Sequence, residues 1–570
     1  MKEQVLKLRE EMEKNGINAY LIPTTDFHGS EYVNEYFKCR EFISGFTGSN
    51  GTLLVTNDEA KLWTDGRYFL QAAQQLEGSG IELMKMGESG VPTIEEYLKE
   101  ILNEDDCLGF DGRVIDCALG YVMEKHCQIE YGKDLVDGLW ADRPALNPSK
   151  VYELDLNVTG ETTESKLARV RSMMAEKGAD YHLISRLEDI AWLYNLRGRD
   201  VKHTPVFFAY ALITMDDDRL YMMDRSYDGR ENLPYEQVYE DLKKLPEGKI
   251  LLDENVVSYA AVKSIAEGVE IINGNNPCEL MKCIKNDTEI NSTLKAHIKD
   301  GVAMVNFLFW LKKNVGKIPM SEISVADYLY DLRMEQEGCF DLSFVTISGY
   351  MENGAIIHYT ATEKTNKEIQ PEGFLLVDSG GQYEEGTTDI TRTIAVGPLT
   401  DEMRKHYTAV LLCNIKLATA RFAEGTVGLE LDNMTRKPLQ DMGLDYKHGT
   451  GHGVGHLLSV HEGPATINPR CKGFPVLPGM IMSDEPGVYL AGQYGIRLEN
   501  EMLYKRGADG MIEAEAITFC PFEREALDLS MMDDEAKKWL NDYHKMVEET
   551  LMPYLDEEVG QWLKTQTAAI

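Results

Sequence analysis

The chain has 570 residues, of which 43% are hydrophobic and 27% charged, a composition typical of a folded protein with more than one hydrophobic core. Acidic residues outnumber basic ones by 95 to 58, and the formal net charge of −37 argues against nucleic acid or an anionic membrane as a partner, because both select a basic face. The ten cysteines are scattered, and the first residues lack the apolar stretch of a signal peptide, so we expect a cytoplasmic protein with reduced thiols.

A weak internal repeat runs through the first half of the chain. Residues 13–22 resemble residues 176–184, and each segment contains a glycine that follows a helix-like apolar stripe and precedes a short apolar strand. Strand-like stretches follow each copy, at residues 52–56 and 207–214. The repeat predicts two related α/β domains.

Clusters of turn-forming residues predict the domain boundaries. They lie at residues 142–149 and 273–277, so we expect domains at 1–148, 149–284 and 285–570. In the third domain, Asn286 begins a helix signal that continues to about residue 313. Its most apolar part is too short to cross a bilayer, so we expect a buried helix and no membrane association. The C-terminal extension, from about residue 533 to 564, is again helical and charged.

The third domain also contains residues suited to bind metal, each at a predicted strand end or in a tight loop. Two acids flank a glycine-bearing loop between predicted strands, the histidine lies in a glycine-rich loop, and two glutamates follow or lie within strand patterns. These residues are Asp378, Asp389, His452, Glu485 and Glu499. Four carboxylates and one imidazole fit two divalent cations bridged by carboxylates better than one ion, which predicts metal-assisted hydrolysis. Any one of these acids taken singly is more often a solvated or capping residue than a metal ligand.

The motifs around these residues resemble the aminopeptidase P group of the pita-bread metallopeptidases, which also include methionine aminopeptidase and prolidase. The resemblance rests on segments at 378–383, 389–393, 452–464, 484–487 and 495–499. Segments 26–32 and 63–69 resemble the first domain of the long, three-domain form of that group. The resemblance therefore implies an α/β (α+β) fold with two related creatinase-like N-terminal domains before a pita-bread catalytic domain.

The same resemblance implies a ligand set and its cofactors. Asp378 and Asp389 would bind one metal ion, Asp389 would bridge to a second, and His452, Glu485 and Glu499 would complete the pair. Two divalent ions per subunit are implied, manganese being usual in the family, and the oxygen-rich ligands would also accept cobalt or zinc.

Further roles follow from the resemblance. His358 and His461 would line the substrate site and stabilise the tetrahedral intermediate, and Glu485 would shuttle a proton as well as bind metal. Peptide binding would involve Arg67, His448, His452 and Arg497 together with the two catalytic histidines. Without the family pattern, His358, His448 and His461 would be ordinary hydrogen-bonded histidines, and Arg67 a structural arginine after a turn.

The expected activity is release of the N-terminal residue from peptides with proline at the second position, through a hydroxide that bridges the two metals. A homodimer is implied by the resemblance alone. The nearest alternative is a prolidase-type dipeptidase that cuts only X-Pro dipeptides. A metal-free peptide- or histone-binding module of the same fold is a further alternative, although the intact ligand set disfavours it.

Overall fold

The computed structural model describes residues 2–471 and 473–570, which form two compact units. The first unit consists of Met1–Leu156 and Glu161–Leu280, and the second of Asn157–Gly160 and Met281–Ile570. The division into three domains at residues 148 and 284 stays a prediction. Among the described residues, no helix combines the length and the apolar character that crossing a bilayer requires.

The first unit contains two six-stranded sheets of identical topology. In each sheet, two central antiparallel pairs are flanked by parallel strands. Strand β1 (Ala19–Pro23) pairs antiparallel with β2 and parallel with β5, and β8 (Tyr181–Ile184) pairs in the same way with β10 and β13. The order of the first sheet is β4 (Glu82–Lys85), β3 (Ala60–Thr64), β2 (Thr52–Thr56), β1 (Ala19–Pro23), β5 (Cys107–Gly109) and β6 (Gln128–Glu130). The order of the second is β12 (Leu233–Pro234), β11 (Asp218–Met222), β10 (Ala209–Thr214), β8 (Tyr181–Ile184), β13 (Gly248–Leu252) and β14 (Val269–Asn273).

The internal repeat of the sequence marks corresponding positions in these two sheets. Gly16 ends α1 (Glu3–Asn15) before β1, and Gly178 ends α7 (Thr163–Lys177) before β8. Both glycines have φ 68° and ψ 31°, a left-handed conformation that residues with a Cβ seldom adopt. The prediction of two related α/β sheets is therefore confirmed. The other helices of this unit are α2 (Cys39–Ser44), α3 (Phe69–Gln75), α4 (Ile94–Ile101), α5 (Cys117–Glu124), α8 (Leu187–Tyr194), α9 (Gln237–Leu242) and α10 (Tyr259–Lys263).

The second unit begins with the long helix predicted from the sequence, α12 (Asp287–Asn314). Asn286 caps it by accepting hydrogen bonds from the backbone N–H groups of Thr288 and Glu289, while the Glu289 side chain accepts a hydrogen bond from the Asn286 N–H.

The C-terminal extension forms two helices, because Pro553 follows the end of the first. The helices of this unit are α12, α13 (Glu322–Met334), α14 (Asp401–Ala418), α15 (Gly428–Thr435), α16 (Lys437–Gln440), α17 (Asp534–Leu551) and α18 (Glu557–Gln566).

Four sheets of the second unit carry the residues of interest. Two are three-stranded, one is six-stranded and one is a hairpin. Their strands, in spatial order, are β15 (Cys339–Leu342), β18 (Gly381–Tyr383) and β19 (Gly386–Thr387); β16 (Ile347–Tyr350), β17 (Phe374–Ser379) and β20 (Ile390–Ala395); β21 (Arg421–Phe422), β28 (Ile512–Ala516), β27 (Asn500–Arg506), β24 (Ile481–Asp484), β22 (Gly451–Gly453) and β23 (Glu462–Ile467); and β25 (Gly487–Leu490) with β26 (Tyr494–Arg497).

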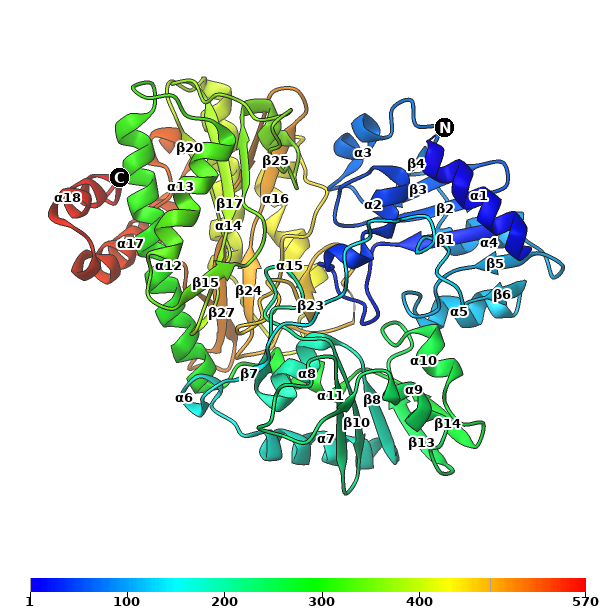
Figure 1. Cartoon of the computed structure of the whole chain (residues 1–570). Helices are drawn as coiled ribbons and strands as arrows, with labels where there is room; N and C mark the ends of the chain where they lie inside the picture. Colours follow the sequence, from blue (N-terminus) through cyan, green and yellow to red (C-terminus); the bar gives the residue numbers. More distant parts are fainter. Residues whose placement is uncertain (1, 472) are drawn as a thin grey trace. The chain divides into compact units, whose positions relative to one another are not determined.

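Helices pack on these sheets through buried apolar faces. Residues such as Phe307 and Leu311 of α12 contact the core around Leu375 of β17 and Ile394 of β20. Figure 1 shows α12 and α13 alongside these strands, with α17 and α18 at the C-terminal end of the unit. The helices therefore cover one face of these strands, and polar residues at the ends of several strands form a common site.

Candidate metal centre

Two adjacent antiparallel strands present the first two predicted ligands. Asp378 lies in β17, and Asp389 directly precedes β20. The register pairs Asp378 with Thr391, so the two strands bring both carboxylates to one end of the pair. A tight approach makes this possible, because a Cβ added at Gly380 would lie 1.9 Å from the carbonyl oxygen of Thr388.

His452 lies in β22, and Glu485 directly follows the neighbouring strand β24. His452 Nδ1 contacts the carbonyl oxygen of Gly453 at 2.9 Å, and since a carbonyl only accepts, Nδ1 carries the proton. In the neutral ring, Nε2 therefore keeps its lone pair. That nitrogen lies 3.6 Å from Asp389 Oδ2 and 3.5 Å from Glu485 Oε1. The imidazole thus offers an electron pair toward two carboxylates.

Glu499 enters the same cluster from the turn between β26 and β27. Its backbone N–H donates to the carbonyl of Thr391 at 3.0 Å, and the Thr391 hydroxyl donates to Glu499 Oε2 at 2.7 Å. One ligand atom of each of Asp389, His452 and Glu499 lies within 4.8 Å of the others. Residues separated by more than a hundred positions in sequence therefore converge on one small volume.

Three carboxylate oxygens in this cluster are buried and unsatisfied. Asp378 Oδ1, Asp389 Oδ1 and Glu499 Oε1 have no hydrogen-bond partner among the described residues. Burial, followed by the nearby charges of Glu499 and Asp378, raises the pKa of Asp389 well above its usual value. Burial and then the charges of Asp378 and Glu485 do the same to the pKa of Glu499. Such a group of buried acids is stable in ionised form only with a compensating positive charge.

The donor set fits divalent metal ions. Unpartnered carboxylate oxygens and one neutral imidazole nitrogen are the ligands that hard or borderline divalent cations prefer. The fit rests on the three orphaned oxygens, which a bound cation would satisfy, and on the position of His452 Nε2 beside Asp389 and Glu485. The predicted ligands Asp378, Asp389, His452, Glu485 and Glu499 thus lie close together, while their assignment as ligands stays a prediction.

Arg497, a predicted substrate contact, hydrogen-bonds within the protein, and its role in binding peptide stays a prediction. Nη2 donates to Asp378 Oδ2 at 2.5 Å, and Nη1 donates to the Tyr489 hydroxyl at 2.8 Å. The Tyr489 hydroxyl also lies 2.8 Å from His448 Nε2. Because His448 Nδ1 donates to the Gly449 carbonyl at 2.7 Å, Nε2 accepts from Tyr489 in the neutral ring. A continuous hydrogen-bonded chain therefore joins His448 to Asp378, a predicted ligand.

The other two histidines lie at the border of the cluster. The ring of His461, directly before β23, stands edge-on to that of His452 with centroids 4.3 Å apart. His358 lies half-buried in a turn, and the carbonyl of the preceding residue, Ile357, accepts from Arg497 Nη2 at 3.3 Å. His461 therefore contacts the predicted ligand His452, and the backbone directly before His358 is hydrogen-bonded to Arg497.

Arg67 lies in the first compact unit, apart from the other predicted site residues in the chain. Nε and Nη2 each donate to the carboxylate of Asp65 at 2.8 Å, and Nη1 lies 3.7 Å from Glu31 Oε1. The side chain is therefore anchored beside acids of its own domain. Its role in holding peptide stays a prediction.

Sequence reasoning missed several residues that build the site. No motif includes Tyr489, and nothing in the 389–393 motif singles out Arg392. In the sequence Arg497, Glu499 and Glu501 alternate with other residues, as on one face of a strand, and the structure shows that Glu501 accepts from the Asp389 N–H at 2.7 Å. The alternating pattern was the one available signal for Glu501.

Comparison with known proteins matches family models over most of the chain. Residues 291–506 match the metallopeptidase family M24, and residues 510–570 match the C-terminal region of peptidase M24. Residues 4–137 and 142–289 each match a creatinase/prolidase N-terminal domain. A probable Xaa-Pro aminopeptidase P from Laccaria bicolor is 38% identical, with the alignment covering 100% of this chain and 93% of the relative. Aminopeptidase P2 from Arabidopsis thaliana is 36% identical, with coverage of 97% and 86%.

Solved structures agree with this assignment. The X-prolyl aminopeptidase of Caenorhabditis elegans, described as a cytosolic enzyme with a di-nuclear active site, superposes with a TM-score of 0.95 at 32% identity and covers 100% of this chain and 99% of its own. The prolidase of Pyrococcus horikoshii OT3 shares the fold, with a TM-score of 0.51 at 23% identity over 64% of this chain and 99% of its own. On the extent and identity of these matches, the chain belongs to the Xaa-Pro aminopeptidase P group of the M24 metallopeptidases.

Proposed function

We propose that this protein is an Xaa-Pro aminopeptidase that hydrolyses the bond after the first residue of peptides whose second residue is proline. The observation that carries the proposal is the convergence of the unsatisfied oxygens of Asp378, Asp389 and Glu499 with the lone pair of His452. Relatives of similar length that bear this activity in their names support the choice over a prolidase. The prolidase neighbours support the fold alone, at 23% identity.

The residues proposed to hold two divalent ions are Asp378, Asp389, His452, Glu485 and Glu499. Bound there, such ions polarise a carbonyl group and lower the pKa of water to near neutrality. We propose manganese as the native metal, with cobalt or zinc as substitutes that the same ligands accept. Arg497 holds Asp378 in place through a charge-assisted hydrogen bond, so this ligand keeps its orientation before metal arrives.

Glu485 is suited to move a proton. Its side chain is 19% exposed, against 6% for Asp389, so Glu485 is the more solvent-accessible of the two carboxylates. A carboxylate in this position accepts a proton from water and passes it to the leaving amine nitrogen. We therefore assign Glu485 the catalytic acid–base role.

The histidines are proposed to act on the substrate. His358 and His461 donate hydrogen bonds to the oxygen that gains negative charge at the scissile carbonyl, and His461 keeps its position by packing against His452. His448, fixed through Tyr489 to Arg497, is placed to contact peptide with His452. Arg67 would contribute to peptide binding from the N-terminal part. Proline lacks an N–H and has a fixed φ, so the site must recognise shape as much as hydrogen bonds.

We further propose a cytosolic homodimer built of three domains, 1–148, 149–284 and 285–570. In the described part of the chain none of the ten cysteines forms a disulfide bond, which agrees with the reducing compartment that we propose. Light scattering coupled to size-exclusion chromatography tests the dimer directly. A monomeric mass at micromolar concentration would overturn that part of the proposal.

The activity is tested by a substrate pair. Manganese-loaded protein is given an X-Pro-Pro tripeptide and the matching X-Pro dipeptide, and release of the first residue is followed for both. We expect turnover of the tripeptide that EDTA abolishes and manganese restores. Efficient turnover of the dipeptide alone would identify a prolidase, and the absence of both bound metal and hydrolysis would favour the peptide-binding alternative.

A further inference from the structure

A second buried arginine, besides Arg497, lies next to the cluster of proposed ligands. Arg392 lies in β20, next to Thr391, and is 1% exposed. Its guanidinium makes six hydrogen bonds, which use every N–H that an arginine offers. Because the surroundings are closely packed, a shift of one hydrogen-bond partner of Arg392 displaces the guanidinium and, with it, the other partners.

Three of these hydrogen bonds fix the segment that carries a proposed ligand. Nη1 donates to the carbonyl of Thr391 at 2.9 Å and to the carbonyl of Glu499 at 2.5 Å, and Nη2 donates to Asn500 Oδ1 at 2.8 Å. Thr391 in turn donates its hydroxyl to Glu499 Oε2. Arg392 therefore holds the backbone of Glu499 on one side and the residue that orients its carboxylate on the other.

The other three hydrogen bonds reach the C-terminal region. Nε donates to the carbonyl of Pro521 at 3.1 Å, and Nη2 donates to the carbonyl of Cys520 at 2.7 Å and to the Tyr543 hydroxyl at 3.0 Å. Tyr543 belongs to α17, and its hydroxyl lies 3.2 Å from Asn500 Oδ1. The ring of Phe522 lies under the guanidinium at 4.2 Å from its carbon.

The positive charge of Arg392 has no carboxylate among its hydrogen-bond partners in the described part of the chain. All six acceptors are carbonyl, amide or hydroxyl oxygens. This is unlike Arg333, which is equally buried but forms an ion pair with Asp300 through Nε and Oδ1 at 2.8 Å. Because no carboxylate pairs with this guanidinium, its binding depends on the positions of the neutral acceptors. Each acceptor must lie in line with an N–H of the planar group.

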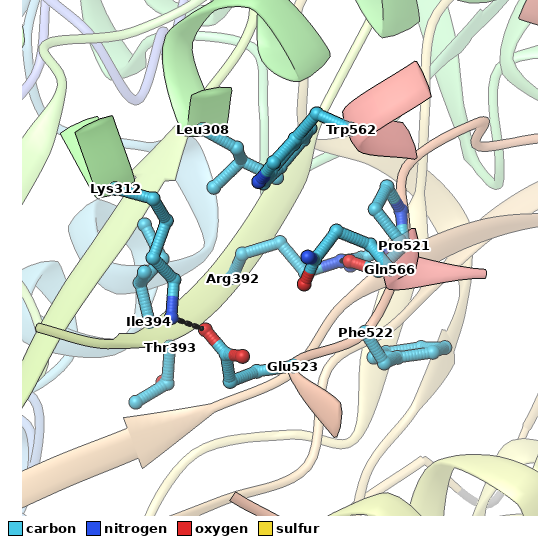
Figure 2. Close-up of a pocket in the computed structure, with 10 residues that line it drawn as sticks. All are labelled: Leu308, Lys312, Arg392, Thr393, Ile394, Pro521, Phe522, Glu523, Trp562 and Gln566. Carbon is cyan, nitrogen blue, oxygen red and sulfur yellow. Dashed lines mark hydrogen bonds and ion pairs between the residues drawn. The ribbon is translucent and has the colours of Figure 1, made fainter. Parts of the chain in front are cut away.

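Figure 2 shows how the C-terminal helix closes this region. Trp562 and Gln566 of α18 line the same small pocket as Arg392, together with Phe522 and Glu523. Its cavity of about 20 Å³ is large enough for roughly one water molecule, so the region is packed and not a ligand pocket. Helix α18 therefore borders the same pocket as the arginine, and α17 contacts the arginine through Tyr543.

We propose that Arg392 is a positioning residue through which the C-terminal region, by way of Tyr543, sets the orientation of Glu499 and hence the affinity of the centre for its metal ions. The inference rests on the proposed function, in that Glu499 binds metal. It assigns residues 510–570 a role in the metal centre beyond stability. Pro521, Cys520 and Tyr543, which all belong to that region, accept hydrogen bonds from the arginine that holds the Glu499 backbone. Outer partners of metal ligands commonly change metal affinity by 10–100-fold when altered.

Manganese binding to the metal-free full-length protein tests the proposal. Isothermal titration and Mn²⁺ EPR compare the wild type with Arg392→Lys, which keeps the charge but loses the fork, and with Tyr543→Phe, which loses one hydroxyl. Arg333→Lys is the matched control, since it alters an equally buried guanidinium that contacts none of the five proposed ligands. Thermal unfolding of each metal-free variant is measured in parallel.

The expected result is a 10–100-fold weaker manganese affinity for Arg392→Lys and a smaller, several-fold loss for Tyr543→Phe. Arg333→Lys should bind manganese as the wild type does, although its unfolding temperature falls. Wild-type affinity in Tyr543→Phe and in folded Arg392→Lys would overturn the proposal, as would an equal loss in Arg333→Lys. If Arg392→Lys does not fold, the Tyr543→Phe titration alone decides. A wild type that binds no manganese would overturn the proposed function itself, which distinguishes that failure from this one.

Discussion

The side chain of Glu501 accepts a hydrogen bond from the backbone N–H of Asp389, with 2.7 Å between Oε1 and the nitrogen. Its other oxygen, Oε2, lies 3.2 Å from Nε2 of His297 on α12. Glu501 and Asp389 are 112 residues apart in sequence, and both are buried. The bond thus fixes the start of β20, where a proposed ligand lies, to β27.

Replacing Glu501 tests the energetic weight of this bond. Glu501→Leu leaves the Asp389 N–H buried without an acceptor, and we expect the free energy of unfolding to fall by about 1–3 kcal/mol. Glu501→Gln keeps an oxygen acceptor of the same reach and should lose less. Urea unfolding of the metal-free proteins measures both. Equal losses in the two variants would contradict a role for the hydrogen bond.

Glu485→Gln should abolish catalysis while the fold is retained. The amide is nearly isosteric with the carboxylate but neither takes up a proton nor binds a divalent ion well. We expect hydrolysis of an X-Pro-Pro tripeptide to fall by about 10²–10⁴-fold or more. Glu525→Gln is a matched control because the side chain of Glu525 is 71% exposed. Activity of Glu485→Gln close to that of the control would refute the assigned role.

Metal removal should make stability strongly pH-dependent. In the metal-free protein, the pKa values of Asp389 and Glu499 are raised above those of the unfolded chain, mainly by burial. A carboxyl group with a raised pKa favours the folded state at acidic pH, and this contribution is lost as the pH rises through the folded-state value.

Bound metal replaces the proton, so its stabilisation should increase with pH over the same range. Thermal unfolding in EDTA and in manganese, from pH 5 to pH 8, measures the difference. We expect the gap between the two unfolding temperatures to widen toward pH 8. A gap independent of pH would show that these carboxyl groups do not exchange protons for metal.

Protonation of the buried His544 ring should lower the free energy of unfolding at acidic pH. Burial, with smaller effects from Arg392 and Arg524, lowers its pKa to about 3, and its Nε2 accepts from the Phe522 N–H at 3.1 Å. Because the unfolded-state pKa is near 6.5, folding favours the neutral ring, so stability is full above pH 6.5 and declines as the pH falls toward 3.

Between pH 6.5 and pH 5 this single group contributes a decline of about 2 kcal/mol. His544→Gln retains an acceptor but does not titrate, so its unfolding free energy should depend less on pH in that interval. His126→Gln, at a partly exposed histidine, serves as the control. An unchanged slope for His544→Gln in urea unfolding would contradict the assignment.

Much of the architecture could be predicted from sequence because it depends on local pattern. The Gly16 and Gly178 turns, the Asn286 cap and the apolar stripe of α12 are determined by residues a few positions apart. The order and type of the five metal-capable residues, and the motifs around them, were likewise sufficient to indicate the family.

The second layer of the site was decided by tertiary structure. Tyr489 connects His448 to Arg497, Glu501 supports Asp389, and Arg392 joins Glu499 to the C-terminal helix α17. Period-2 alternation tells which face of a strand a residue occupies, but not which distant strand or helix lies opposite that face. The contacts of Glu501 and Arg392 join segments more than a hundred residues apart, and the contact between Tyr489 and His448 spans 41 residues. The sequence by itself thus determined which side chains could bind metal, while the packing of β17, β20, β24 and β27 decided what holds those side chains in place.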